Sequence, residues 1–394
     1  MGPQHRRLQC DRDGRGPLSR SGSPGHHRCA FISKSACSSI ADISTLGFGV
    51  AANFSRMTLA FASALMTGVA VLVLLASAVW GALALWYCLE PRPYANGIAA
   101  LLWPIFCLVL LVSYWRGWRL RAALAYALGM ALLLLWWGTI VPSNARDWTP
   151  DVARNLHGDL EGDSLTLTNL RNFDWRSETD FTPHWETRRY DLSKLQSVDL
   201  IADYWMGEAI AHILVSYGFS DGQYLVWSTE VRKHEGQSFS VVAGFFKQSE
   251  LVILAGDERD FLRLRTNVRK EDLRIYRVML PVAIARAVLL HYVDEANKLA
   301  IHPRWYNTLT TNCTTVVFDV TRMVETGIPL DWRVLFSGYF PNYAYDHQAL
   351  DQSLPFDILL EKAKFSQRGQ AADSLPSAEF SRAIRAGVPG IPQN

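Results

Sequence analysis

Three runs of apolar residues without a charged side chain dominate the first part of the chain, at 57–89, 93–115 and 122–145. A helix needs roughly 20 apolar residues to cross the hydrocarbon core of a bilayer, and each run is long enough. Three buried helices of a soluble domain are the weaker interpretation, because the runs follow one another so closely. The pattern predicts a membrane region over residues 57–145, with transmembrane helices at about 60–88, 97–115 and 122–141.

The positive charges predict the orientation of these helices. Residues 1–56 carry eight Lys or Arg against three Asp, and Arg116, Arg119 and Arg121 follow the second helix. The loop between the first two helices has only Arg92, beside Glu90. Basic loops stay in the cytoplasm. We therefore expect a multi-pass protein of the cytoplasmic (inner) membrane, with everything after Ala145 on the periplasmic, extracytoplasmic side.

Both ends of the chain are poor in core-forming residues. Residues 1–56 are rich in Ser, Gly and Arg, which predicts a disordered basic arm. They are alternatively an artefact of start-site choice, since Met57 stands just before the first apolar run. Ser, Ala, Gly, Pro and Gln dominate from Ser366 onward, which predicts a disordered tail over 366–394.

The patterning after the membrane region predicts an α+β domain. Strands are indicated by alternating or β-branched stretches, and the runs at 208–219 and 222–237 predict a hairpin across Ser-Asp-Gly. An amphipathic helix is expected at 281–300, with Pro281 at its start, and another from about Thr310. We expect an antiparallel sheet packed against helices.

Cys313 is the only cysteine after Cys107 in the chain. Thr310, Thr311 and Asn312 precede it and are competent helix caps, which places the thiol in the first turn of a helix. The helix dipole there favours a thiolate, and hence a nucleophile. The alternative is a small buried apolar side chain. Thr311 and Asn312 are the expected capping or oxyanion residues.

His212 is the expected base for this thiol, because it interrupts a strand that is otherwise apolar. A hydrogen-bonded core histidine is the alternative for one isolated case. On the next strand, Glu230 or Ser228 is placed to hold the second imidazole nitrogen, although Glu230 alternatively pairs with Arg232. If the dyad exists, the start of the Cys313 helix must face the His212 strand, with the thiol within hydrogen-bonding reach of the imidazole.

Several motifs together resemble one family. They are RDWTPDV, LTNLRNFDW, AHILVSYGF, WSTEVRK, GDERDFLRLRT and WYNTLTTNCTT, within residues 146–350. This region is similar to the Lnb N-terminal periplasmic domain family. The resemblance implies a circularly permuted papain-like fold, related to NlpC-type hydrolases and lecithin:retinol acyltransferase-like enzymes. It also implies that Cys313 is the nucleophile and His212 the histidine. In the family, further membrane helices follow the domain, whereas here three precede it and none follow, so the substrate does not carry over.

These observations favour a membrane-anchored cysteine-dependent acyltransferase or hydrolase. Its substrate is expected to be an ester or amide of a lipoprotein, lipid or peptidoglycan. The alternative is a non-catalytic binding or envelope-assembly module that keeps the fold. We expect no metal site, because one cysteine and scattered histidines lack metal-ligand spacing. We also expect no cofactor and no nucleic-acid partner.

Overall fold

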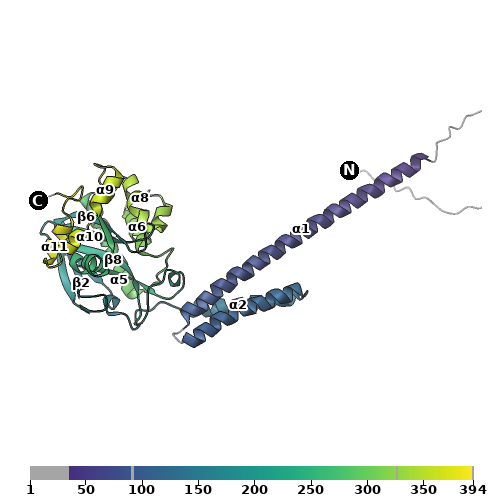
Figure 1. The fold of residues 1–394 in the computed structure, drawn as a ribbon, viewed down its shortest axis with the longest axis horizontal. Coiled ribbons are helices and arrows are strands. Elements are labelled where there is room, and N and C mark those ends of the chain that lie inside the picture. Colours follow the sequence, from purple (N-terminus) through teal and green to yellow (C-terminus); the bar gives the residue numbers. More distant parts are fainter. Residues whose placement is uncertain (1–34, 90–92, 325–326, 393–394) are drawn as a thin grey trace, which may run out of the picture. The chain divides into compact units, whose positions relative to one another are not determined.

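The computed structural model describes residues 35–89, 93–324 and 327–392. The chain forms two compact units, residues 1–72 and 73–394. In the described part of the first unit the structure is one helix, the beginning of α1 (Ser35–Cys88). The second unit holds the rest of α1, two more apolar helices and a sheet with helices on both faces (Figure 1).

The apolar helices are α1, α2 (Pro93–Trp115) and α3 (Arg119–Thr139). Three stretches of them are long and apolar enough to cross a membrane: Met57–Cys88, Tyr94–Trp115 and Arg119–Thr139. Their bounds agree with the predicted spans within a few residues. In the second unit, the Trp103 indole donates a hydrogen bond to the Ser77 carbonyl (2.8 Å), which joins α2 to α1.

The prediction of a disordered arm is partly wrong. Residues 1–34 lie outside the described residues, but 35–56 continue α1 as a helix. This stretch contains no proline, so the backbone hydrogen bonds of α1 run through it without a break.

The domain after the membrane region is α+β, as predicted. Its strands are β1 (His157–Glu161), β2 (Ser164–Arg171), β3 (Asp174–Trp175), β4 (Phe181–Thr182), β5 (Trp185–Asp191), β6 (Leu195–Tyr204), β7 (Ala211–Phe219), β8 (Tyr224–Arg232), β9 (Glu250–Gly256) and β10 (Asp272–Val278). Its main helices are α4 (Glu258–Arg263), the π-helix η4 (Leu264–Arg269), α5 (Val282–Ile301), α6 (Cys313–Val324), α7 (Trp332–Leu335), α8 (Phe340–Asp346), α9 (Phe356–Ala363), α10 (Ser366–Ala371) and α11 (Ser377–Ile384). Short 3-10 turns are η1 (Pro150–Val152), η2 (Leu192–Lys194), η3 (Ala243–Phe245) and η5 (Ser337–Tyr339).

The main sheet has the order β1-β2-β9-β8-β7-β6-β10, with β5 also paired to β2. The expected β7–β8 hairpin is present. The sheet is mostly antiparallel, as expected, but it is mixed, because β2 meets β9 in parallel at Arg171 and Gly256. The glycine permits this close approach, since a Cβ atom at position 256 would lie 2.1 Å from the Arg171 carbonyl oxygen.

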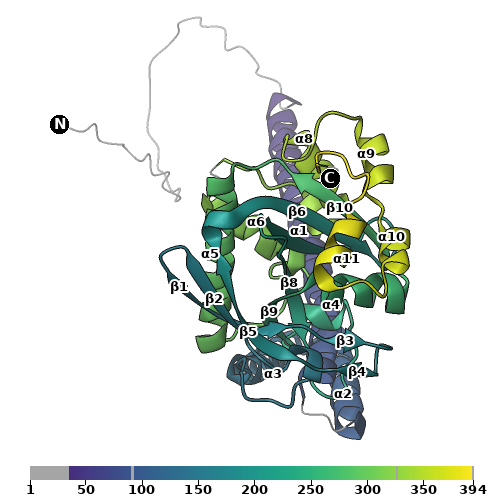
Figure 2. The same ribbon diagram turned by 90° about the vertical axis from the view of Figure 1, so that its left-hand side faces the viewer.

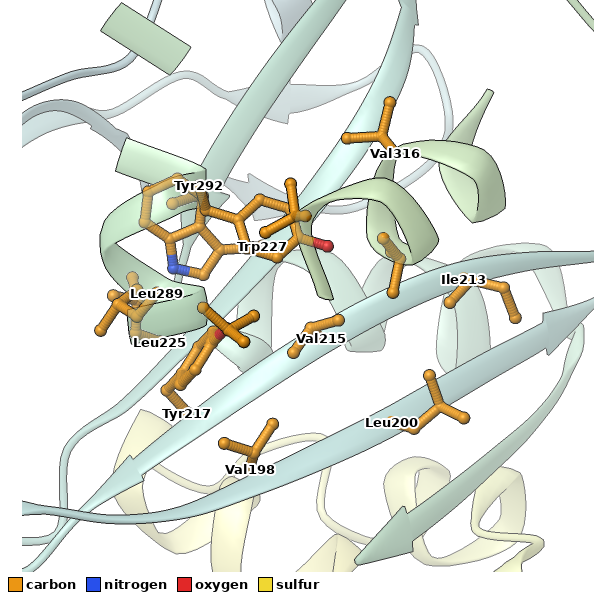
Figure 3. Packing of buried hydrophobic residues seen from close by; sticks show 14 of the residues in the cluster. Val198, Leu200, Ile213, Val215, Tyr217, Leu225, Trp227, Leu289, Tyr292 and Val316 are labelled. Carbon is orange, nitrogen blue, oxygen red and sulfur yellow. The ribbon is translucent and has the colours of Figure 1, made fainter. Parts of the chain in front are cut away.

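Each face of the sheet is covered by a separate set of helices (Figure 2). On one face, α5 and α6 bury apolar side chains against β7 and β8, with Tyr292 of α5 beside Trp227 at a ring-centroid distance of 5.5 Å (Figure 3). On the other face, Leu214 and Val226 pack with Phe261 of α4 and Phe380 of α11. Apolar side chains on both sides explain why the central strands read as nearly continuous hydrophobic runs.

The prediction of a disordered tail is wrong. The segment forms α10 and α11, and Phe380, Ile384 and Val388 are buried in the second core. Phe380 and Ile384 lie four residues apart, so they form one stripe on α11 although the composition of the segment is polar. Val388 adds to this core from the turn that follows the helix. Arg385 extends the attachment by pairing with Asp199 of β6 and Glu258 of α4.

Candidate active site

Cys313 is the first residue of α6, and Asn312 caps this helix. The Asn312 Oδ1 atom accepts hydrogen bonds from the backbone N–H groups of Thr314 and Thr315, both at 2.9 Å. In return, Thr315 Oγ1 accepts from the Asn312 N–H at 2.8 Å. Asn312 is only 7% exposed. The cap therefore fixes the thiol in the first turn, at the positive end of the helix dipole.

Of the two expected capping residues, Asn312 caps α6 and Thr311 does not. The Asn312 side-chain amide also donates to the Thr308 carbonyl at 2.7 Å, so Asn312 is committed to the cap and the preceding loop. Thr311 does not cap α6: its backbone pairs with Asn307 at 3.0 Å in both directions, and its hydroxyl lies beside that of Thr310. The prediction of a capping role is wrong for Thr311, because the cap position falls one residue later.

His212 lies near the start of β7, just beyond the end of the β7–β8 ladder, whose last pair is Leu214 with Ser228. Side chains alternate along a strand, so His212, Ser228 and Glu230 project on the same face as Leu214. The imidazole Nε2 atom lies 2.8 Å from Ser228 Oγ and 3.2 Å from Glu230 Oε1. Ser228 also donates to Glu230 Oε1 at 2.7 Å. Both residues considered for the orienting role thus gather at one imidazole nitrogen.

The thiol and the imidazole meet where the two strands part. Val316 and Val320 of α6 pack on the α5 face of the sheet, whereas His212 projects on the opposite face. The Cys313 thiol and the His212 side chain line the same cavity, and His212 and the Ile213 backbone both lower the pKa of the thiol. Since Nε2 faces Ser228 and Glu230, Nδ1 is the imidazole nitrogen that remains for the thiol.

The electrostatics of the pair favour a thiolate and an imidazolium. Burial alone raises the pKa of Cys313, but the charge and hydrogen bond of His212 outweigh it and lower the pKa. Burial also disfavours the charged imidazole, yet Glu230 and Cys313 outweigh this effect and raise the pKa of His212 to about 10. The pKa of Glu230 lies well below its ordinary value despite burial, because His212, Arg265 and Ser228 stabilise its charge.

A buried arginine behind Glu230 was not predicted from the sequence. Arg265 donates from Nη2 to Glu230 Oε1 and from Nε to Asp203 Oδ2, both at 2.9 Å. It lies in the π-helix η4, a distortion that often occurs at functional sites. The signal available in the sequence was Asp203, a charge that directly follows the apolar run 200–202 of β6 and so requires a buried partner.

The sulfur and the imidazole lie at a cavity of about 530 Å³. Asp203, Glu230 and Arg265 line it on one side, and Trp205 and Phe239 contribute apolar surface. Among the described residues, no group of three or more His, Cys, Asp or Glu side chains is arranged to hold a metal ion.

A comparison of the sequence with known families gives a match. Residues 181–338 match the model of the Lnb N-terminal periplasmic domain family. Neither a curated protein nor a solved structure matches the chain. The Lnb match covers His212, Ser228, Glu230, Arg265 and Cys313, and thereby confirms the resemblance noted from the motifs.

The Lnb match also bears on where the domain lies. It begins at β4 and ends in η5, within the wider region 146–350 over which the motifs were noted. Together with three helices that could span a membrane, the match to a domain named periplasmic indicates a membrane protein with an extracytoplasmic domain.

Proposed function

We propose that the protein is a cysteine-dependent acyltransferase or hydrolase, anchored in the cytoplasmic membrane with its active site on the periplasmic side. The substrate is an ester or amide of a lipoprotein, lipid or other envelope component. The observation that carries the proposal is the capped Cys313 paired with His212, whose other nitrogen is held by Ser228 and Glu230. The order of histidine before cysteine also fits a circularly permuted papain-like arrangement.

In the first step, the Cys313 thiolate attacks the substrate carbonyl carbon and forms a tetrahedral intermediate. Asn312 occupies the Thr314 and Thr315 N–H groups, so the Cys313 N–H is the donor at the helix start for the oxyanion. The His212 imidazolium then gives its proton to the leaving alcohol or amine, and the C–O or C–N bond breaks. The product is an acyl thioester on Cys313.

In the second step, an amine or a water molecule attacks the thioester carbonyl. Neutral His212 takes the proton of this nucleophile, and the Cys313 thiolate leaves. An amine gives acyl transfer, and water gives hydrolysis. Glu230 keeps its negative charge throughout, because Arg265 and Ser228 hydrogen-bond to it, and it stabilises the imidazolium form.

The proposed ion pair of the Cys313 thiolate with the His212 imidazolium predicts how Cys313 reacts with iodoacetamide as the pH changes. The thiolate is present above the lowered pKa of Cys313, so alkylation of this residue should reach half its maximum rate at a lower pH than for an ordinary cysteine. His212→Ala removes the charge that opposes burial, so the half-point should rise by at least about one pH unit. Mass spectrometry of the Cys313 peptide measures the rate at each pH.

His157→Ala is the matched control, because His157 is a half-exposed histidine of β1. It should leave the half-point unchanged. An ordinary half-point near about 8.5 that is insensitive to His212→Ala would contradict the proposal and favour a binding module. Thermal melts of both variants separate a loss of reactivity from a loss of fold.

A further inference from the structure

Exposed apolar side chains surround one side of the cavity mouth. Trp205 and Met206 follow β6, and Phe239 lies in the segment between β8 and β9; all three line the cavity. Trp205 and Phe239 make an edge-to-face contact, with ring centroids 5.5 Å apart at 82°. Val242 and Phe245 extend this surface along the same segment, and each is 47% exposed. We call these five residues the rim.

The segment that carries the rim ends on the membrane helices. Two residues after Phe245, the Lys247 ammonium donates to the carbonyl oxygens of Trp137 (2.7 Å) and Ile140 (3.1 Å), at the last turn of α3. Phe246 packs edge-on against Trp137 and stacks on Tyr87 near the end of α1. The rim is therefore continuous with the ends of two helices that could span a membrane.

The chemistry at this junction is that of a bilayer surface. Trp and Tyr at helix ends, with a Lys beside them, are typical of the membrane–water interface. A contiguous group of exposed aromatic and aliphatic side chains marks a membrane or protein contact. A protein partner would have to reach the rim beside the helix ends. Lipid is already next to the rim, because the bilayer that holds α3 surrounds the end of this helix.

We propose that the rim inserts into the surface of the phospholipid bilayer in which α1–α3 are embedded, and that the cavity opens toward this leaflet. The docking does not depend on the proposed chemistry. If that chemistry holds, the rim delivers an acyl chain to Cys313 from the bilayer and not from the aqueous phase.

The test places an environment-sensitive fluorophore at single sites of the full chain in phospholipid nanodiscs. The six native cysteines are first replaced by serine, and one cysteine is then introduced by Phe239→Cys or Phe245→Cys. Ile358→Cys is the matched control, because Ile358 is 43% exposed on α9, which packs against the edge strand β10. Leu128→Cys, a 64% exposed position on α3, reports on the hydrocarbon core.

Lipids with a nitroxide on the acyl chain should quench both rim probes at least half as strongly as they quench the Leu128 probe. They should quench the Ile358 probe several-fold less than the rim probes. Rim probes that are quenched no more than the Ile358 probe would overturn the proposal, as would a Leu128 probe that is not quenched at all. The labelled variants lack Cys313, so they test only whether the rim inserts into the bilayer. A failure of the catalytic proposal is measured in other experiments and cannot be confused with a failure of insertion.

Discussion

Cys313→Ser is expected to lower turnover by roughly 10³-fold or more, while the melting temperature stays nearly unchanged. A serine hydroxyl remains protonated at neutral pH, so it cannot form the ion pair with His212 that keeps the nucleophile charged. The fold should tolerate the change, because the Thr314 hydroxyl lies 3.8 Å from the thiol and serine differs from cysteine by a single atom. Turnover and thermal unfolding of the purified full chain are the two measurements.

Thr311→Ala is the control for this substitution. Thr311 stands two residues before Cys313, but it neither caps α6 nor lines the cavity. Its loss should leave turnover within a few-fold of the unmodified chain. If Cys313→Ser retained turnover, or melted far earlier than Thr311→Ala, Cys313 would be a packing residue and not a nucleophile.

The largest effect on stability is expected at Arg385, in the segment that follows α11. Its guanidinium bonds Glu258 at 2.6 and 2.7 Å and Asp199 at 2.8 Å, and both carboxylates are fully buried. Arg385→Met removes the charge but keeps much of the side-chain length. Among the described residues, Glu258 would then keep only the Ser216 hydroxyl as a side-chain partner, whereas Asp199 would keep Arg277. The buried charge of Glu258 should therefore cost about 3–5 kcal/mol of unfolding free energy. For a domain of this size, the melting temperature should fall by roughly 10 °C or more.

Arg382→Met is the matched control, because Arg382 lies three residues earlier, in α11, and is exposed. It should change the unfolding free energy by no more than about 0.5 kcal/mol. Equal melting temperatures for the two variants would contradict the packing of α11 and would restore the disordered tail that composition suggested.

The sequence carries strong signals for the membrane helices and for the pair at the site. A helix-capping asparagine before Cys313 is a local feature, and a polar ring at His212 stands out against an apolar strand. The choice between Ser228 and Glu230 could not be made from the strand pattern. Both share one face of β8, and in the structure both reach the same imidazole nitrogen.

Features that depend on long-range packing were not accessible to pattern reading. Arg265 joins β6 to β8 from a π-helix, and only the folded sheet brings its partners Asp203 and Glu230 together. The stripe of Phe380 and Ile384 is short and embedded in polar residues, so its composition resembles that of a disordered chain. The parallel contact of β2 with β9 likewise depends on where distant strands meet.

The most direct test of the central claim is to trap the acyl-enzyme. The full chain is incubated with phospholipid vesicles and a synthetic diacylated lipopeptide, quenched in acid and digested with trypsin. The peptide from Trp305 to Arg322 contains Cys313 and no other cysteine. The account predicts a fatty-acyl mass on this peptide that neutral hydroxylamine removes and that His212→Ala reduces. Turnover of either substrate without any such adduct on Cys313 would contradict it.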